Sequence, residues 1–244
     1  MILDALFFAA HPDDAELSSG GTIAKLTSQG FKVGIIDFTE GELGTRGSTE
    51  LRYKEAEEAS KILKISVREN LKLPDGKLTA SEEFVNEAIK RIRLYKPKIV
   101  FAPYFNDRHP DHTGAGEIVK KAFFFSGLEK IETELSGKKQ AAFRPNKVFY
   151  YMQTFEFKPS FVVDITNFFE TKMEAVRAYG SQFHNPGSNE PETFISQPAF
   201  IRYLESRASY YGFQIRRNYG EPFFCEEEIE LDLKQYLEMA NNLS

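Results

Sequence analysis

The chain has 244 residues, of which 41% are hydrophobic and 27% charged, and its formal net charge is −5. This length and hydrophobic content can bury one sizeable core, so we expect a single domain over residues 1–244. The acidic balance and the lack of a basic block argue against a nucleic-acid partner. No apolar run approaches the ~18 residues that would span a bilayer, so we expect no membrane partner either.

The cysteine content and the first residues indicate the compartment. The single cysteine, Cys225, excludes an internal disulfide. The N-terminal residues lack the basic region and the long apolar core of a signal peptide. Both observations predict a cytoplasmic protein. The acidic balance makes small molecules the favoured partners.

Short apolar runs alternate with helical patterns along the chain. We predict strands over residues 2–10, 32–38, 71–74, 98–103, 148–152, 161–165 and 222–225. We predict helices from a cap at Ser18 or Ser19 to Gly30, over 49–63 and 81–95, from a cap at Thr113, and over 167–178 and 198–211. This alternation predicts an α/β fold with a Rossmann-like, doubly wound, mostly parallel sheet flanked by helices.

Three segments between these elements have an unusual composition. Residues 39–48 are rich in glycine and charge, so they form a candidate substrate loop, with an ordinary strand-to-helix connection as the alternative. Residues 127–145 are polar and rich in Lys and Glu, which predicts a mobile connection or a lid. The phenylalanine run at 123–125 favours core packing, with a subunit contact as the alternative.

Two polar motifs carry the chemistry. Residues 11–14, His-Pro-Asp-Asp, follow the first strand, and residues 109–112, His-Pro-Asp-His, follow the fourth. The carboxyl ends of parallel strands meet at one edge of a sheet, where ligands bind. His11 and Asp14 stand three apart, so a helical turn places them on one side. With His112 they provide two imidazoles and one carboxylate, which suits Zn²⁺ with one open position, and Fe²⁺ as an alternative.

Neighbouring side chains in the same motifs suit acid–base roles. Asp13 lies beside the three ligands but is not needed as one, so it is the candidate general base. His109 is one turn before His112 and, as an imidazolium, would stabilise an oxyanion, with Asp111 orienting it and raising its pKa. His184, the remaining histidine, is interpreted as a loop residue.

These motifs resemble the zinc-dependent deacetylases of the PIG-L/LmbE type, whose substrates carry an N-acetylglucosaminyl group. The resemblance rests on residues 10–16 with Gly20-Gly21, residues 39–44, Arg52 ahead of Glu55-Ala56, and residues 109–112. The branch that deacetylates N-acetylglucosaminyl-malate in bacillithiol biosynthesis is the most similar, through residues 159–165, Lys172, Ala175 and 181–183. The resemblance implies a zinc-dependent N-deacetylase and a homo-oligomer, with a hexamer as one form.

Two arginines bear on the rest of the substrate. Arg52 begins the helix after the glycine-rich loop, and Arg108 directly precedes His109. Two guanidinium groups near one crevice would bind a dicarboxylate such as malate, because arginine pairs with carboxylates in a planar, bidentate way. The alternative is that both arginines pair with neighbouring Asp and Glu side chains.

Other functions share part of this evidence. A related deacetylase would act on an N-acetylglucosaminide with an inositol or oligosaccharide aglycone. A non-haem iron oxygenase uses two histidines and one carboxylate, although the alternating α/β pattern argues against it. A sugar-binding protein without catalysis would bind ligand and release no acetate.

Overall fold

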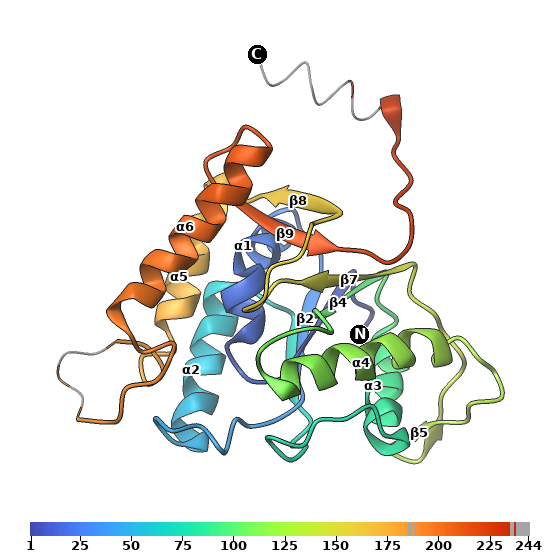
Figure 1. Ribbon diagram of the computed structural model, residues 1–244. Helices are drawn as coiled ribbons and strands as arrows, with labels where there is room; N and C mark the ends of the chain where they lie inside the picture. The colour runs from blue at the N-terminus through green and yellow to red at the C-terminus, as the bar shows by residue number, and fades with distance from the viewer. Residues whose placement is uncertain (185–186, 188, 235–236, 238–244) are drawn as a thin grey trace.

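The computed structural model describes residues 1–184, 187, 189–234 and 237 of the chain. A seven-stranded sheet lies at its centre, in the order β3-β2-β1-β4-β7-β9-β8 (Figure 1). Its strands are β1 (Ala5–Ala9), β2 (Val33–Asp37), β3 (Val67–Asn70), β4 (Ile99–Pro103), β7 (Lys147–Tyr151), β8 (Phe161–Asp164) and β9 (Gly220–Phe224). Neighbouring strands from β3 to β7 are parallel, whereas β9 is antiparallel to both of its neighbours. The prediction of a mostly parallel sheet is confirmed.

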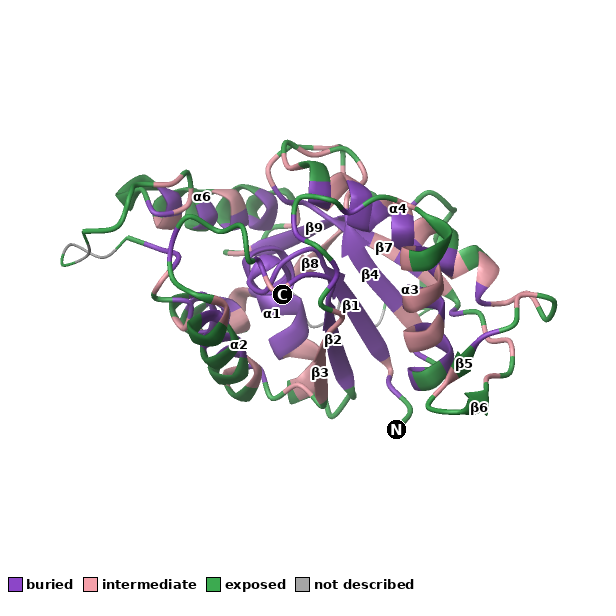
Figure 2. Cartoon of the chain, turned by 90° about the horizontal axis from the view of Figure 1, so that it is seen from below, coloured by how far each residue is buried: buried purple, intermediate pink, exposed green. Residues whose placement is uncertain are grey.

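Helices cover both faces of this sheet. They are α1 (Asp14–Ser28), α2 (Thr49–Ile62), α3 (Glu82–Tyr95), α4 (Pro110–Phe125), α5 (Phe169–Arg177) and α6 (Pro198–Gln214), with a short 3₁₀ turn, η1 (Thr166–Phe168). Figure 2 shows the buried strands between α1 and α2 on one side and α3 and α4 on the other. One hydrophobic core lies under α1, α2, α5 and α6, and a second lies under α3 and α4. This is the predicted doubly wound, single-domain α/β fold.

The central strand β1 explains why the first apolar run ends at a functional site. All five residues of β1 are buried, with Phe7 in one core and Phe8 in the other. Burial on both faces is what makes a central parallel strand continuously apolar. The strand order runs in opposite directions on the two sides of β1, through β2 and through β4. Ligands bind at the carboxyl ends of strands at such a switch point.

The third strand was predicted in the wrong place. It is β3, Val67–Asn70, and not residues 71–74. β3 is an edge strand of half-buried, mostly polar residues, so it lacks the apolar run that marks the central strands. Its Arg68 pairs with the buried Asp37 of β2 at 2.7 Å, and this pairing allows a charged residue within the strand.

The first helix begins earlier than predicted. α1 starts at Asp14 with Asp13 as its N-cap, so the predicted caps Ser18 and Ser19 lie inside the helix. Asp13 has a φ of 120°, which is uncommon for any residue other than glycine. Strained backbone of this kind persists where the surrounding structure fixes it, and it clusters at functional sites. The His-Pro-Asp-Asp motif is therefore the strand-to-helix turn itself.

The fourth helix also begins earlier than predicted. α4 starts at Pro110, a residue suited to the first helical position. His109 is the N-cap, and its Nδ1 accepts the N–H of Asp111 at 3.2 Å. Thr113, the predicted cap, lies in the first turn, and its hydroxyl accepts the N–H of Asp107 at 3.3 Å. Both motifs thus occupy helix N-termini at the same edge of the sheet.

Residues 127–145 are attached to the body of the protein rather than placed over a site. The segment contains a small hairpin, β5 (Glu134–Leu135) and β6 (Lys138–Lys139). Arg93 of α3 is buried, and its guanidinium donates to the carbonyls of Leu128 and Ile131. No residue of the 127–145 segment lines the cavity at the carboxyl ends of β1 and β4. Of the two predicted alternatives, this placement favours a connection over a lid.

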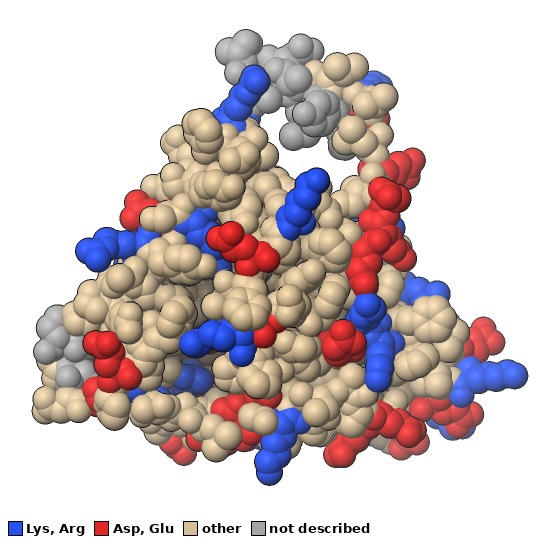
Figure 3. Space-filling view, in the orientation of Figure 1, with Lys and Arg blue, Asp and Glu red and all other residues tan. Residues whose placement is uncertain are grey.

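Within the described ranges, helices are too short or too polar to cross a bilayer. On the face drawn in Figure 3, Lys and Arg side chains lie interspersed with Asp and Glu rather than in one basic patch.

Candidate metal centre and active site

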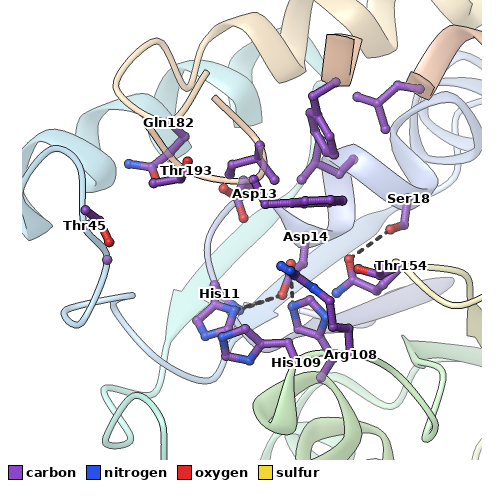
Figure 4. Close-up of a pocket in the computed structure, with 18 of the residues that line it drawn as sticks. His11, Asp13, Asp14, Ser18, Thr45, Arg108, His109, Thr154, Gln182 and Thr193 are labelled. Atoms are coloured by element: carbon purple, nitrogen blue, oxygen red, sulfur yellow. Dashed lines mark hydrogen bonds and ion pairs between the residues drawn. The ribbon is translucent and has the colours of Figure 1, made fainter. Parts of the chain in front are cut away.

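A cavity of about 400 Å³ opens at the carboxyl ends of β1 and β4. The two polar motifs line one side of it, together with residues 43–45 of the glycine-rich loop. Residues 153–154 after β7, residues 193–195 and α6 complete the walls. Figure 4 shows His11, Asp14 and His109 close together, with Arg108 reaching toward the same space.

The three predicted metal ligands converge in this cavity. The Nδ1 atom of His11 lies 3.5 Å from one oxygen of Asp14, and the Nε2 atom of His112 lies 3.3 Å from the other. One ligand atom from each residue falls within 4.8 Å of the others, a spacing that can hold one ion. The predicted turn geometry is also present, because the N–H of His11 donates to Asp14 Oδ2 at 2.9 Å.

Carboxylates hold the far nitrogen of each of the two imidazoles. The Nε2 atom of His11 lies 3.0 Å from Asp75 Oδ1, and the Nδ1 atom of His112 lies 2.8 Å from Asp107 Oδ1. A second-nitrogen partner of this kind fixes the tautomer and the ring orientation of a metal-binding histidine. The donor atoms and their supports therefore fit a divalent cation.

The electrostatic field points to the same conclusion. Burial alone would lower the pKa of His11, but the carboxylates of Asp111, Asp14 and Asp75 hold it well above its usual value. Burial is likewise outweighed at His112, where Asp14 and Asp107 raise the pKa to about 9. A field that stabilises protons on two imidazoles also favours a cation that replaces those protons.

Asp13 directly precedes the ligand Asp14, but it belongs to neither of the two residue clusters that have metal-ligand spacing. Its side chain is buried, and burial raises its pKa to about 7. The charge of Arg52 lowers this pKa and the charge of Asp14 raises it. A carboxylate with a pKa near neutrality is able both to accept and to return a proton at physiological pH.

His109 differs from its predicted state. Burial, followed by the positive charges of His11 and His112, lowers its pKa. Its Nδ1 accepts a main-chain N–H, so the proton of the neutral ring resides on Nε2. The structure thus favours a neutral imidazole that donates through Nε2, and not the predicted imidazolium.

Asp111 takes only part of its predicted role, because its charge raises the pKa of His109 but is outweighed there by burial and by the charges of His11 and His112. Its two oxygens accept the N–H groups of Gly76 and Leu78 at 2.6 and 3.0 Å. Its Oδ2 lies 3.4 Å from Nε2 of His11, so the residue it faces is His11 rather than His109. His11, His109 and Asp111 form a second group with metal-ligand spacing. Both oxygens of Asp111 accept main-chain N–H groups, whereas in Asp14 only Oδ2 does, so the first group is the better site.

Both predicted substrate arginines line the cavity, but in different surroundings. Arg52 is buried, and its Nη2 donates to the side-chain oxygen of Gln182. Gly41 has a φ of 66°, and a side chain there would collide with the Arg52 guanidinium. Arg108 is exposed and lies over the ring of Phe194, 4.3 Å from its centroid.

Sequence reasoning missed three residues around the cavity. The sequence marks Asp75 only as a turn residue and Asp107 only as a loop residue, because nothing local identifies a carboxylate that supports a distant histidine. Arg207 of α6 lines the cavity and donates to the main-chain oxygens of Gln153 and Leu17. Its position in a helix without a motif gives no signal. His184 does not line the cavity, in agreement with its interpretation as a loop residue.

This fold and this edge-of-sheet site define a class of protein. The family model described as "PIG-L: GlcNAc-PI de-N-acetylase" matches residues 6–123, which span β1 to α4 and both polar motifs. The chain belongs to the PIG-L family.

Individual relatives support this membership. Diacetylchitobiose deacetylase from Thermococcus kodakarensis is 33% identical over 230 residues, 86% of this chain and 78% of the relative. The crystal structure of a conserved protein from Thermus thermophilus superimposes with a TM-score of 0.85 at 36% identity, covering 95% of this chain and 98% of that one. N,N'-diacetylchitobiose deacetylase from Pyrococcus horikoshii, complexed with its inhibitor, gives a TM-score of 0.77 at 28% identity, with 90% and 82% covered.

Proposed function

We propose that this chain is a metal-dependent deacetylase that hydrolyses the acetamide of an N-acetylglucosaminide. The observation that carries the proposal is the convergence of His11, Asp14 and His112, with the buried Asp13 beside them. The names of the relatives support it, because two of the similar proteins are diacetylchitobiose deacetylases.

Zn²⁺ is the proposed metal. Two imidazole nitrogens and one carboxylate oxygen match the ligand set of catalytic zinc sites, although Fe²⁺ also uses such a set. When bound, the ion supplies Lewis acidity, polarising an amide carbonyl and lowering the pKa of water. His11, Asp14 and His112 would hold it, and Asp75 and Asp107 would orient the two rings.

The chain's own residues account for the proton transfers. Asp13 accepts the proton of the attacking water, for which its pKa of about 7 is suited. It then returns this proton to the departing nitrogen, so that acetate and a free amine leave. The Nε2–H of the neutral His109 donates a hydrogen bond to the oxygen that develops negative charge. Asp111 acts through His11, as its contact indicates.

The malate conjugate is the proposed substrate. Within the described part of the chain, the Arg108 guanidinium has an aromatic contact and no carboxylate partner, so it is available to an anionic aglycone at the cavity mouth. Arg52 lies deeper, beside Asp13 and Gln182, which places it closer to the sugar and the amide. A carboxylate of a malate aglycone would pair with the Arg108 guanidinium, and Arg52 would contact the sugar and the amide.

A panel of substrates tests both the proposed deacetylation and the proposed malate aglycone. Acetate release is measured from N-acetylglucosaminides carrying malate, inositol or a second sugar, with zinc added and oxygen removed. We expect release without oxygen, with the highest kcat/KM on the malate conjugate. Faster release from another aglycone would reassign the substrate. Dependence on oxygen would indicate an oxygenase, and tight binding without release would indicate a sugar-binding protein.

The aglycone assignment has its own variant test. Arg108→Ala should raise KM for the malate conjugate about tenfold and leave KM for N-acetylglucosamine methyl glycoside unchanged, because only the first carries carboxylates. Glu205→Ala, on the exposed surface of α6, is the control. Equal losses on both substrates would remove the role of Arg108 in binding the aglycone.

A further inference from the structure

Asp107 lies in the connection between β4 and α4, and its side chain is only 1% exposed. Its two carboxylate oxygens face two different parts of the active site. Oδ1 lies 2.8 Å from Nδ1 of His112 and also accepts the N–H of His109 at 3.2 Å. Oδ2 accepts the N–H groups of Thr154 and Phe155 at 2.7 and 3.0 Å. One buried carboxylate therefore joins a candidate metal ligand to the chain that follows β7.

The contact with His112 determines which ring nitrogen has a lone pair free to bind a metal. A carboxylate accepts hydrogen bonds and cannot donate them, so Nδ1 of His112 carries the proton. The lone pair then resides on Nε2, the atom that lies 3.3 Å from Asp14. With the opposite tautomer, Nε2 would present a hydrogen and would be unable to ligate.

The contact with Thr154 and Phe155 determines the shape of a cavity wall. Gln153 and Thr154 line the cavity directly after β7 ends. Both amides that follow Gln153 donate to the same oxygen of Asp107, which fixes the local turn. Because this wall borders the cavity, its position affects how a substrate fits there.

We propose that Asp107 is a positioning residue that couples the orientation of His112 to the conformation of the Gln153–Phe155 wall. This inference rests on the metal site of the proposed function. The ligand and the wall do not adjust independently, because both are bonded to one buried side chain. Displacement of the wall would rotate the carboxylate and with it the His112 ring.

Two substitutions separate the two contacts. In Asp107→Asn, the single amide oxygen can still accept the Thr154 and Phe155 N–H groups, which leaves the NH₂ group facing His112. That NH₂ is a donor, so it stabilises the tautomer in which Nε2 is protonated and unable to bind metal. Asp107→Ala removes both of these contacts, together with the hydrogen bond from the His109 N–H. Asp164→Asn is the matched control, because Asp164 accepts the N–H of Thr166 at 3.0 Å in a turn outside the cavity.

Two readouts other than activity test the coupling. Amide hydrogen exchange of Thr154 and Phe155 is measured by NMR in the metal-free full chain, and zinc affinity by competition with a chelator. We expect Asp107→Asn to retain wild-type protection of both amides and to lose about 10–100-fold in zinc affinity. Asp107→Ala should lose both the amide protection and the zinc affinity. Asp164→Asn should keep both at the wild-type level. Thermal melting of each variant establishes that it is folded.

The outcomes are distinguishable from a failure of the proposed function. Wild-type zinc affinity in Asp107→Asn, or unchanged amide protection in a folded Asp107→Ala, would overturn the coupling while the metal site stands. Absence of zinc binding by the wild-type chain would overturn the proposed function and this inference together. At saturating zinc, we also expect Asp107→Ala to raise KM and Asp107→Asn to lower kcat without that change in KM.

Discussion

At the scale of single residues, burial and a neighbouring charge act in opposite directions on the pKa of Asp13. Burial raises its pKa to about 7, and the nearby Arg52 guanidinium pulls that value down. A general base works only when deprotonated, so the rate falls as pH decreases through its pKa. Arg52 therefore affects the rate near neutrality through the pKa of Asp13.

Replacing Arg52 with glutamine tests this relation. Arg52→Gln removes the charge that stabilises the Asp13 carboxylate, so the acid limb of the pH profile of kcat/KM should move to higher pH by about one unit. Arg108→Gln is the control, because Arg108 is not among the main causes of the shift in the pKa of Asp13. An acid limb that stays in place in Arg52→Gln would mean that Asp13 is not the titrating base.

At the scale of elements, a buried ion pair connects α1, α5 and β9 behind the site. Lys172 lies 2.6 Å from Glu221, with both side chains nearly inaccessible to solvent. Glu221 also accepts the N–H groups of Gly21 and Thr22 and the hydroxyl of Thr22. This pair anchors the helix that begins at Asp14.

Breaking this pair should destabilise the fold. Lys172→Met leaves the Glu221 carboxylate buried without its cation, which costs about 3 kcal/mol in the free energy of unfolding. The double variant Lys172→Met/Glu221→Gln should recover part of the loss, because no unpaired charge is then buried. Urea denaturation monitored by circular dichroism measures both values. A loss below about 1 kcal/mol in the single variant would contradict this role of the pair.

Sequence patterns located the elements that are regular and the side chains that lie in motifs. Central strands such as β1 are buried on both faces and therefore read as apolar runs, and residues 11–14 and 109–112 follow such runs. The edge strand β3 was misplaced because its polar residues are accommodated by a tertiary ion pair. Asp75 and Asp107 were missed for a similar reason, since each supports a histidine that other parts of the chain bring near.

At the scale of the whole molecule, the homo-oligomer implied by the family resemblance stays a prediction. In the phenylalanine run at 123–125, Phe124 is 53% exposed, whereas Phe123 and Phe125 pack against the core. The run is therefore mainly a core feature. Larger exposure occurs on α6, where Tyr210 is 59% and Phe213 79% exposed. Exposed apolar residues that gather into a patch mark surfaces that another protein covers.

Light scattering on a gel-filtration column tests this prediction. We expect the molar mass to be a whole multiple, at least twofold, of the mass of one chain and to be independent of added zinc. A mass equal to that of one chain across the concentration range would show that the resemblance does not extend to assembly.

The proposed mechanism depends most on which of the two adjacent aspartates binds the metal. The direct measurement is zinc content by atomic emission, together with acetate release, for wild type, Asp13→Ala and Asp14→Ala. The mechanism predicts about one zinc per chain in wild type and in Asp13→Ala, very little in Asp14→Ala, and acetate release by the wild type alone. Loss of zinc from Asp13→Ala, or its retention by Asp14→Ala, would contradict the assignment of the two residues.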